Sequence, residues 1–406
     1  MEWKEVRLGD IVEIVNGFAF KSKAFTLEGI PVIKIKNIKA GKVILNDLDY
    51  ISTSDINPKY IKIRSSDILI TMTGNRMDGS PETWVGKVSL FRHQGDFYLN
   101  QRVSALRLID DSVDNNFLSY YLSSWQSQIY FALNSNSSGG QANITPAVVQ
   151  EYRLLVPELE VQHRIASILS SLDRKIELNN KINADLEEMA QAIFKNWFVD
   201  FEPFKDGKFV DSELGMIPEG WKVGSPYEYV KVVYGAPYKS AKFNDNGEGL
   251  PLIRIRDLKD CNPQFYTPEI LPQTEYVNMG DIVAGMDAEF VPHIWKGNTG
   301  LLNQRVCKLM PQQTSISNLF VLYLMKPELE FVQSYKTGTT VSHLGKADID
   351  KFVVVLPPLK VVEECSKILD SILQRIMNIS AESRTLSLLR DTLLPRLMSG
   401  ELEIPE

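Results

Sequence analysis

The chain has 406 residues, a net charge of −7 at neutral pH, 44% hydrophobic residues and three cysteines. This length suits two core-forming domains with additional structure, and the acidic balance argues against a protein that coats nucleic acid regardless of sequence. No apolar run reaches eighteen residues and Met1–Glu5 lacks the apolar core of a signal peptide, so we expect no membrane span and a cytoplasmic protein with reduced thiols.

The first 155 residues predict a mixed α and β domain. Short β-branched runs indicate strands at 32–35, 67–70 and 103–108, and apolar spacing indicates a helix over 117–131. The polar stretch 135–143 predicts a loop, and Thr145 before Pro146 predicts the capped start of a short helix.

A long helix without Pro or Gly is predicted over 160–198. Its apolar residues alternate at spacings of three and four, which is typical of a coiled-coil seam, and the same pattern returns 200 positions later. By count, Asn179 and Asn183 face Ile379 and Ser383, and Pro395 is expected to shorten the second helix. The two seams comprise Ile165, Ile168, Leu169, Leu172, Ile176, Ile182, Leu186, Met189 and Ile193, then Cys365, Ile368, Leu369, Ile372, Ile376, Leu386, Leu389 and Leu393.

The globular segment is also repeated. Trp3-Lys4 returns as Trp221-Lys222, residues 29–36 return as 249–256, and Leu99–Val103 returns as Leu302–Val306. We therefore predict an α+β protein with two homologous globular domains and two long helices, divided as 1–156, 157–200, 201–355 and 356–406. The linker after Phe198 is too short to lead back along a helix of about 60 Å, so we expect an antiparallel coiled coil with pseudo-two-fold symmetry.

The sequence contains none of the common catalytic motifs named below. The chain lacks a GxxxxGK[ST] phosphate loop, a GxGxxG turn, the Asn/Asp-Pro-Pro-aromatic stretch of adenine methyltransferases, HExxH and GxSxG. The four histidines are interpreted as ordinary surface or core residues, and Asp348, Asp350 and Lys351 only faintly resemble a nuclease pattern. We expect a recognition or scaffold role with no catalytic residue, cofactor or metal in this chain.

Candidate DNA-binding residues come first from segments that both copies keep. Basic residues suit phosphate contacts and Gln-Arg pairs suit bidentate contacts to bases or phosphates. The alternatives are a solvated strand face for the lysines and an arginine packed on a buried carboxylate. These candidates are Lys21, Lys34, Lys36, Gln101 and Arg102 in the first copy, and Lys239, Arg254, Arg256, Gln304 and Arg305 in the second.

Base-reading residues should instead lie where the copies differ, because the two copies should read different sequences. The first choices are 72–84, with Asn75 and Arg76, and 286–296, with Glu289, His293 and Lys296. The polar loops 135–143 and 337–343 are the second choice.

Several of these segments resemble the specificity subunit of a bacterial type I restriction–modification system. The resemblance covers essentially the whole chain, is weaker at 224–227, and is carried by 16–22, 29–38, 99–103, 192–203 and 393–401. It implies two target-recognition domains that each read half of a split DNA sequence, and helices that dock two methyltransferase subunits, with motor-nuclease subunits joining for restriction. S-adenosylmethionine, ATP and Mg²⁺ would then belong to the partners. The expected partner-binding residues are Glu187, Phe194, Trp197, Phe198, Leu394, Arg396 and Leu397.

Three alternatives stay open at this point. The chain could be a self-sufficient nuclease or methyltransferase, a coiled-coil scaffold without DNA function, or a specificity subunit of another methylase–nuclease architecture. The expected half-site spacing, on the order of one DNA turn, would be set by the coiled coil.

Overall fold

The computed structural model describes residues 3–55, 57–77, 81–138, 140–336 and 343–402. The chain forms two compact units, the first of residues 1–176 and 386–406 and the second of residues 177–385. Each unit takes one globular domain and part of both long helices, so the units run across the four predicted segments.

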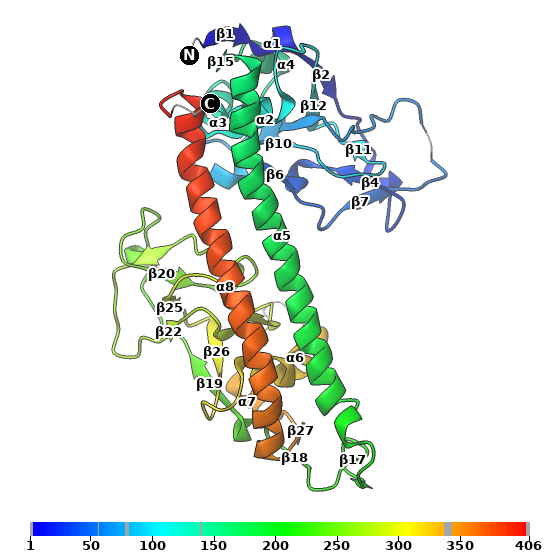
Figure 1. The fold of residues 1–406 in the computed structure, drawn as a ribbon, viewed down its shortest axis with the longest axis vertical. Helices are drawn as coiled ribbons and strands as arrows, with labels where there is room; N and C mark the ends of the chain where they lie inside the picture. Colours follow the sequence, from blue (N-terminus) through cyan, green and yellow to red (C-terminus); the bar gives the residue numbers. More distant parts are fainter. Residues whose placement is uncertain (1–2, 56, 78–80, 139, 337–342, 403–406) are drawn as a thin grey trace. The chain divides into compact units, whose positions relative to one another are not determined.

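The first unit is built on a four-stranded antiparallel sheet of order β10-β8-β12-β2 (Figure 1). Side chains alternate between its faces, so Ile68 and Leu106 pack under the helices whereas Leu69 and Ala105 pack into a second cluster. The strands are β2 (Val12–Asn16), β8 (Ile68–Thr71), β10 (Val88–Leu90) and β12 (Val103–Leu108).

Two helices pack into the same core cluster as Ile68 and Leu106, α2 (Asn115–Ser123) and α3 (Trp125–Leu133). The prediction of one helix over 117–131 was wrong at Ser124. This residue has extended backbone angles, and its side chain accepts a hydrogen bond from the Ser127 amide, so it caps α3 and separates the two helices.

A second sheet of the first unit has the order β11-β4-β7-β3, in which β4 and β11 run parallel. The predicted strand over 32–35 ends early at Ile33, because a 3-10 helix, η2 (Ile35–Asn37), begins there and Asn37 Oδ1 accepts from the Lys34 amide at 3.0 Å. The strands are β3 (Phe25–Thr26), β4 (Ile30–Ile33), β7 (Asp49–Ile51) and β11 (Tyr98–Leu99).

The remaining elements of the first unit are short. The predicted Thr145 cap is confirmed, since its side chain accepts from the Val148 amide at 3.4 Å at the start of α4. They are α1 (Leu8–Ile11), α4 (Pro146–Gln150), the pair β1 (Lys4–Arg7) with β15 (Arg153–Val156), the pair β5 (Ile38–Lys39) with β6 (Lys42–Val43), and the sheet of β13 (Asn136–Ser138), β14 (Gln141–Asn143) and β9 (Thr73–Gly74).

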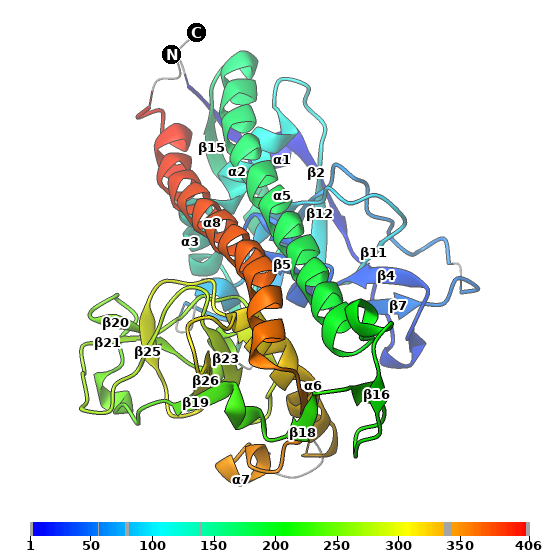
Figure 2. The same ribbon diagram turned by 60° about the horizontal axis from the view of Figure 1, so that its bottom comes forward.

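The second unit repeats this topology (Figure 2). Its main sheet has the order β19-β26-β23-β24 and its second sheet the order β21-β20-β25-β22, with β20 and β25 parallel. The strands are β19 (Val230–Tyr234), β20 (Leu250–Ile253), β21 (Tyr266–Thr267), β22 (Tyr276–Val277), β23 (Ile282–Gly285), β24 (Pro292–Ile294), β25 (Gly300–Leu302) and β26 (Val306–Pro311).

The helix that packs on the main sheet of the second unit is one long element, α6 (Asn318–Lys336). It continues past Pro327, so this proline does not end the helix. The other elements are α7 (Lys346–Ile349), the pair β18 (Lys222–Gly224) with β27 (Val354–Leu356), and the pair β16 (Phe209–Val210) with β17 (Ile217–Pro218).

One close backbone approach recurs in both units and explains a repeated glycine. A Cβ atom on Gly17 would lie 2.1 Å from the carbonyl oxygen of Asn100, and one on Gly235 would lie 2.1 Å from that of Asn303. The two glycines therefore meet the same constraint, because only a residue without a Cβ atom fits against this carbonyl oxygen. The shared contact confirms the predicted repeat of a homologous mixed α/β domain.

The long helices, α5 (Leu159–Phe198) and α8 (Leu359–Met398), each have 40 residues. In the second unit the Asn179 side chain donates to Glu382 at 2.8 Å and that of Asn183 donates to Ser380 at 3.0 Å. In the first unit, Arg390 pairs with Asp173 at 2.9 Å. Within the second unit, partner numbers on α8 fall as those on α5 rise, so the pairing there is antiparallel, as predicted.

Two details of the helix prediction were wrong. Asn179 and Asn183 do not face Ile379 and Ser383, because counting 200 residues finds equivalent positions of the repeat and not opposed positions of an antiparallel pair. Pro395 lies inside α8, which continues to Met398. Within the described residues, none of the helices combines the length and apolar character that crossing a lipid bilayer would require.

Candidate nucleic-acid interface

Lys34 and Arg254 occupy equivalent positions just after β4 and β20, and both side chains turn into their own domain. Lys34 Nζ lies 2.9 Å from Asp49 and 3.5 Å from the centre of the Phe25 ring. The Arg254 guanidinium lies 4.3 Å from the Phe265 ring and its Nε lies 3.4 Å from Asp257. Their charges are therefore engaged within the fold rather than presented on a strand face.

The other basic candidates of this group are exposed. Lys36 lies in η2 and pairs with Asp47 at 2.8 Å and Asp49 at 3.2 Å, and the hydrogen bond to Asp47 raises its pKa. Arg256 lies in the matching 3-10 helix, η7 (Ile255–Asp257), and is also exposed. Lys21 and Lys239 are exposed at the starts of the 3-10 helices η1 (Ser22–Ala24) and η6 (Ser240–Lys242).

A pocket of about 280 Å³ in the first unit brings two predicted residues, Lys36 and Asn75, together. It also contains two lysines that the sequence analysis missed, Lys39 and Lys87. A signal for Lys87 existed, since it lies three residues beyond the variable stretch that we ended at Trp84. The full lining is Ile35, Lys36, Lys39, Thr73, Gly74, Asn75, Glu82, Thr83, Lys87 and Gln141.

The conserved Gln-Arg turn places an arginine beside this pocket in the first unit. Arg102 Nη1 donates to Gln141 Oε1 at 2.9 Å, and Gln141 lines the pocket. Arg305, its equivalent, instead pairs with Asp287 at 2.9 Å. Arg102 and Arg305 are exposed, as are Gln101 and Gln304, whose backbone amides hold the turn. The two arginines thus occupy equivalent positions in the repeats but contact different side chains, Gln141 in the first and Asp287 in the second.

Beside each arginine the backbone frame is the same and the side chains differ. The amides of Ile144 and Leu344 donate to the carbonyls of Met72 and Met286, at 3.0 and 2.7 Å. On the first frame Thr73 Oγ1 donates to Asn143 Oδ1 at 2.8 Å, whereas on the second His343 Nδ1 lies 2.7 Å from Asp287 Oδ1.

These four side chains, Thr73, Asn143, Asp287 and His343, were not singled out from the sequence. They lie in the variable segments where we expected base-reading residues. Asn75 and Arg76 are exposed in the same segment of the first unit. Residues 78–80, 139 and 337–342 of the predicted segments lie outside the described residues.

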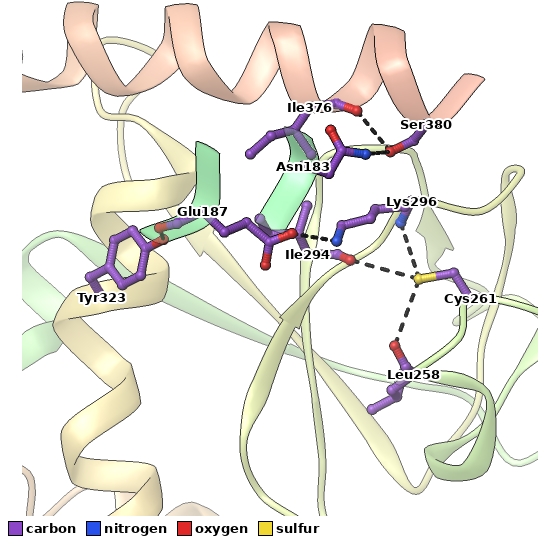
Figure 3. Close-up of polar contacts among 9 residues, drawn as sticks. All are labelled: Asn183, Glu187, Leu258, Cys261, Ile294, Lys296, Tyr323, Ile376 and Ser380. Carbon is purple, nitrogen blue, oxygen red and sulfur yellow. Dashed lines mark hydrogen bonds and ion pairs between the residues drawn. The ribbon is translucent and has the colours of Figure 1, made fainter. Parts of the chain in front are cut away.

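Lys296 and Glu187 were assigned to two different partners, DNA and protein, but they pair with each other (Figure 3). Lys296 follows β24 and Glu187 lies on α5, and the Glu187 carbonyl also accepts from the Tyr323 hydroxyl at 2.8 Å. His293, on β24, is mostly buried, and burial lowers its pKa, which favours the neutral ring. The ion pair attaches the second globular domain to its helix.

The expected partner-binding residues mostly face their own unit. Phe194, Phe198 and Leu397 are buried in the hydrophobic cores, and Trp197 and Leu394 pack against those cores. Arg396 is exposed and pairs with Glu401 at 2.9 Å. The three buried side chains are unavailable to a partner in this conformation.

Other apolar residues of the long helices are exposed, contrary to the predicted seams. Ile168 and Met189 on α5 are 38% and 46% exposed, and Ile368 and Leu389 on α8 are 42% and 45% exposed. Ile368 is the equivalent of Ile168 in the repeat, and Leu389 is the equivalent of Met189, because each lies 200 positions further along the chain. The 3.5-residue spacing did not predict this exposure, because the spacing alone does not distinguish residues that point into the helix pair from residues at its edge.

Metal binding has no support among the described residues, where no group of three or more His, Cys, Asp or Glu side chains lies close enough to hold an ion. The three cysteines are free, and Cys307 and Cys365 are buried.

Comparison with known proteins identifies the family to which the chain belongs. A family model described as the type I restriction modification DNA specificity domain matches residues 1–188 and 218–385. The chain is 25% identical to the type I restriction enzyme MjaIX specificity subunit of Methanocaldococcus jannaschii, covering all of this chain and 94% of the relative. It is 24% identical to the HindI specificity subunit of Haemophilus influenzae, covering 99% of this chain and all of the relative.

A solved structure supports the same fold. The crystal structure of a type I restriction–modification S subunit from M. genitalium superposes with a TM-score of 0.56 at 15% identity, over all of this chain and 97% of the other.

Proposed function

We propose that this chain, which belongs to the family of type I restriction modification DNA specificity domains, recognises a DNA target in two halves on behalf of partner subunits. Family membership gives the chain a DNA sequence-specificity role, and its relatives are recognition subunits rather than catalytic ones. The division of the target between the two repeats is our proposal.

One observation carries the proposal: equivalent backbone frames hold different polar side chains in the two repeats. In the first repeat the buried Thr73 hydroxyl holds the half-buried Asn143 side chain beside Arg102, and in the second an Asp287–His343 pair stands beside Arg305. Side chains that donate and accept in different patterns discriminate different base edges. A shared frame with changed side chains is what two readers of different half-sites require.

An exchange of these side chains tests the proposal. The double variant Asp287→Thr with His343→Asn gives the second repeat the side chains of the first, and the reciprocal variant is Thr73→Asp with Asn143→His. Each assembled complex is analysed by genome-wide mapping of methylated adenines. We expect each variant to alter one half of the recognised sequence and leave the other half intact. Methylation of an unchanged target by both variants would contradict the assignment.

We further propose that the long helices dock two methyltransferase subunits, with motor-nuclease subunits joining them. The support is the repeated exposure of apolar residues, Ile168 with Ile368 and Met189 with Leu389, since exposed apolar residues at equivalent positions of a repeat suit two copies of one partner. S-adenosylmethionine, ATP and Mg²⁺ are then supplied by those partners.

Substitution of exposed apolar residues tests this second proposal, with an exposed residue that has no apolar equivalent in the repeat as the control. Met189→Ser and Leu389→Ser should weaken assembly with the methyltransferase subunit in gel filtration, without lowering the melting temperature of the chain. Leu178 is 53% exposed on α5 but its equivalent is Asn378, so Leu178→Ser should leave assembly unchanged. Equal assembly of all three variants would remove these positions from the docking surface.

A further inference from the structure

We propose that the pocket of the first unit binds a phosphodiester group of the DNA backbone, with Lys87 and Lys39 as its cations. The inference rests on the proposed function. It goes further by assigning a backbone contact to the first repeat and denying an equivalent contact to the second.

Lys87 is a buried ammonium group without a carboxylate partner. It is 6% exposed and its Nζ donates to the backbone carbonyl of Glu82 at 2.8 Å. In the described part of the chain, no carboxylate oxygen lies within 4 Å of this nitrogen. An ammonium carries three donors, and burying its charge without a counter-charge is costly. The pocket beside it is therefore suited to an anion.

Lys39 adds a second cation on the same pocket. Burial is the main cause that lowers the pKa of Lys87 to about 8, and repulsion by Lys39 lowers it further, against a weaker opposing effect of Glu82. Lys39 itself makes no ion pair among the described residues. Two ammonium groups that repel each other across a pocket are both stabilised when an anion enters between them.

The other walls of the pocket supply neutral donors, and Glu82 is the one carboxylate residue among the described lining residues. The amide side chains of Asn75 and Gln141 and the backbone of Gly74 line it, while Lys36 is already held by Asp47 and Asp49. The volume of about 280 Å³ exceeds that of a phosphate group. A phosphodiester oxygen would thus meet charged donors at the back and amide donors at the rim.

The second repeat lacks the buried lysine and carries two additional carboxylates at the same place. Ile70 and Ala284 are equivalent positions of the two repeats, and they pair across the sheet with Val88 and Pro292. Val291, which precedes Pro292, is therefore the equivalent of Lys87, which precedes Val88. By the same alignment Asp287 and Glu289 replace Thr73 and Asn75. Asp287 and Glu289 would repel a phosphate and Val291 offers it no donor, so Lys259, the equivalent of Lys39, has no second cation beside it and the contact belongs to the first repeat.

The test measures the salt dependence of binding to a duplex that carries the mapped target, using the full chain assembled with its methyltransferase subunits. Loss of one phosphate contact lowers the slope of log affinity against log salt by about 0.9. We expect Lys87→Met and Lys39→Met each to weaken binding by a similar factor on all sequences and to lower the slope by about this amount. Lys259→Met, at the position equivalent to Lys39, should change neither.

A pH series gives a second readout. The charged groups around Lys87 are Lys39 from β5, Lys36 from η2 and Glu82 from η3 (Pro81–Thr83). Because burial lowers the pKa of Lys87 to about 8, wild-type affinity should fall relative to Lys87→Met as the pH rises from 7 to 9.

Several results would overturn the inference. If the wild type binds its target and both Lys87→Met and Lys39→Met keep its affinity and slope, the phosphate site is wrong and the recognition role stands. If inorganic phosphate raises the melting temperature of the wild type but not of Lys87→Met, while the DNA slopes are equal, the pocket takes free phosphate and not DNA. If the wild type selects no sequence, the proposed function itself fails. Should Lys87→Met not fold, Lys39→Met decides.

Discussion

Glu187 of α5 and Lys296 of the second globular domain form an ion pair that attaches the domain to its helix. Both side chains are about one third exposed, so solvent screens the pair. The same stretch of α5 accepts the Tyr323 hydroxyl at its carbonyl, which gives the junction a backbone contact that does not depend on charge.

The first prediction concerns this pair. Because it is partly solvated, Glu187→Gln and Lys296→Met should each lower the free energy of unfolding by no more than about 1 kcal/mol. The double variant should cost less than the sum of the two, as a double-mutant cycle of denaturant unfolding would show. The salt slope of DNA binding should not change in Lys296→Met, and a slope reduced by about 1 would return Lys296 to the DNA contacts.

A second prediction separates a structural from a partner-binding role at the end of α5. Phe198 is buried against Phe320 and Trp221 with ring centres 5.2 and 6.0 Å away, so Phe198→Ala should destabilise the second unit by about 3–5 kcal/mol. Chemical denaturation measures this loss. Normal stability with failed assembly would contradict the structural role.

The repeated glycines give a third prediction. A methyl group on Gly17 or Gly235 would meet a carbonyl oxygen at 2.1 Å, so either alanine variant should lower stability by more than about 2 kcal/mol through a forced backbone shift. Gly345→Ala is the control, because its nearest neighbour would lie at 3.6 Å and its φ is −93°. Thermal unfolding of the three variants checks this, and an equal effect in all three would contradict it.

The fourth prediction concerns stability against pH. The folded-state pKa of Lys87 is lowered to about 8, whereas an unfolded lysine has a pKa near about 10.4. Between these values the unfolded chain binds more protons, so the contribution of Lys87 to stability rises with pH over this window. At about 1.36 kcal/mol per pKa unit the rise is about 3 kcal/mol. The difference in unfolding free energy between wild type and Lys87→Met, measured from pH 7 to 10.5, should show it; a flat difference would contradict the burial of a charged Lys87.

The fifth prediction tests the helices as a spacer. Deleting one heptad from both α5 and α8 shortens each by about 10 Å, and we expect a changed spacer in the methylated sequence or loss of binding. Mapping of methylated adenines is the measurement, with conservative seam substitutions such as Leu369→Met as the control. An unchanged spacer length after the double deletion would refute this role.

The sequence by itself determined the repeat, the presence of two long helices and the positions of three central strands of the first domain, because these depend on periodicity and on local backbone preferences. Strand β12 over 103–108 and the Thr145 cap follow directly from such local signals. The antiparallel pairing also followed from chain length, since a short linker cannot retrace a long helix.

Tertiary structure alone decided which polar groups meet. Lys34 turned to Asp49 and Phe25, Lys296 turned to Glu187, and Lys87 came to lie beside Lys39, although none of these pairs is marked by spacing in the chain. Side-chain charge depends on burial and on neighbours brought from distant segments. The sequence therefore shows which residues carry charge. Only the folded chain shows which of these charges are paired within the protein and which are free to bind a ligand.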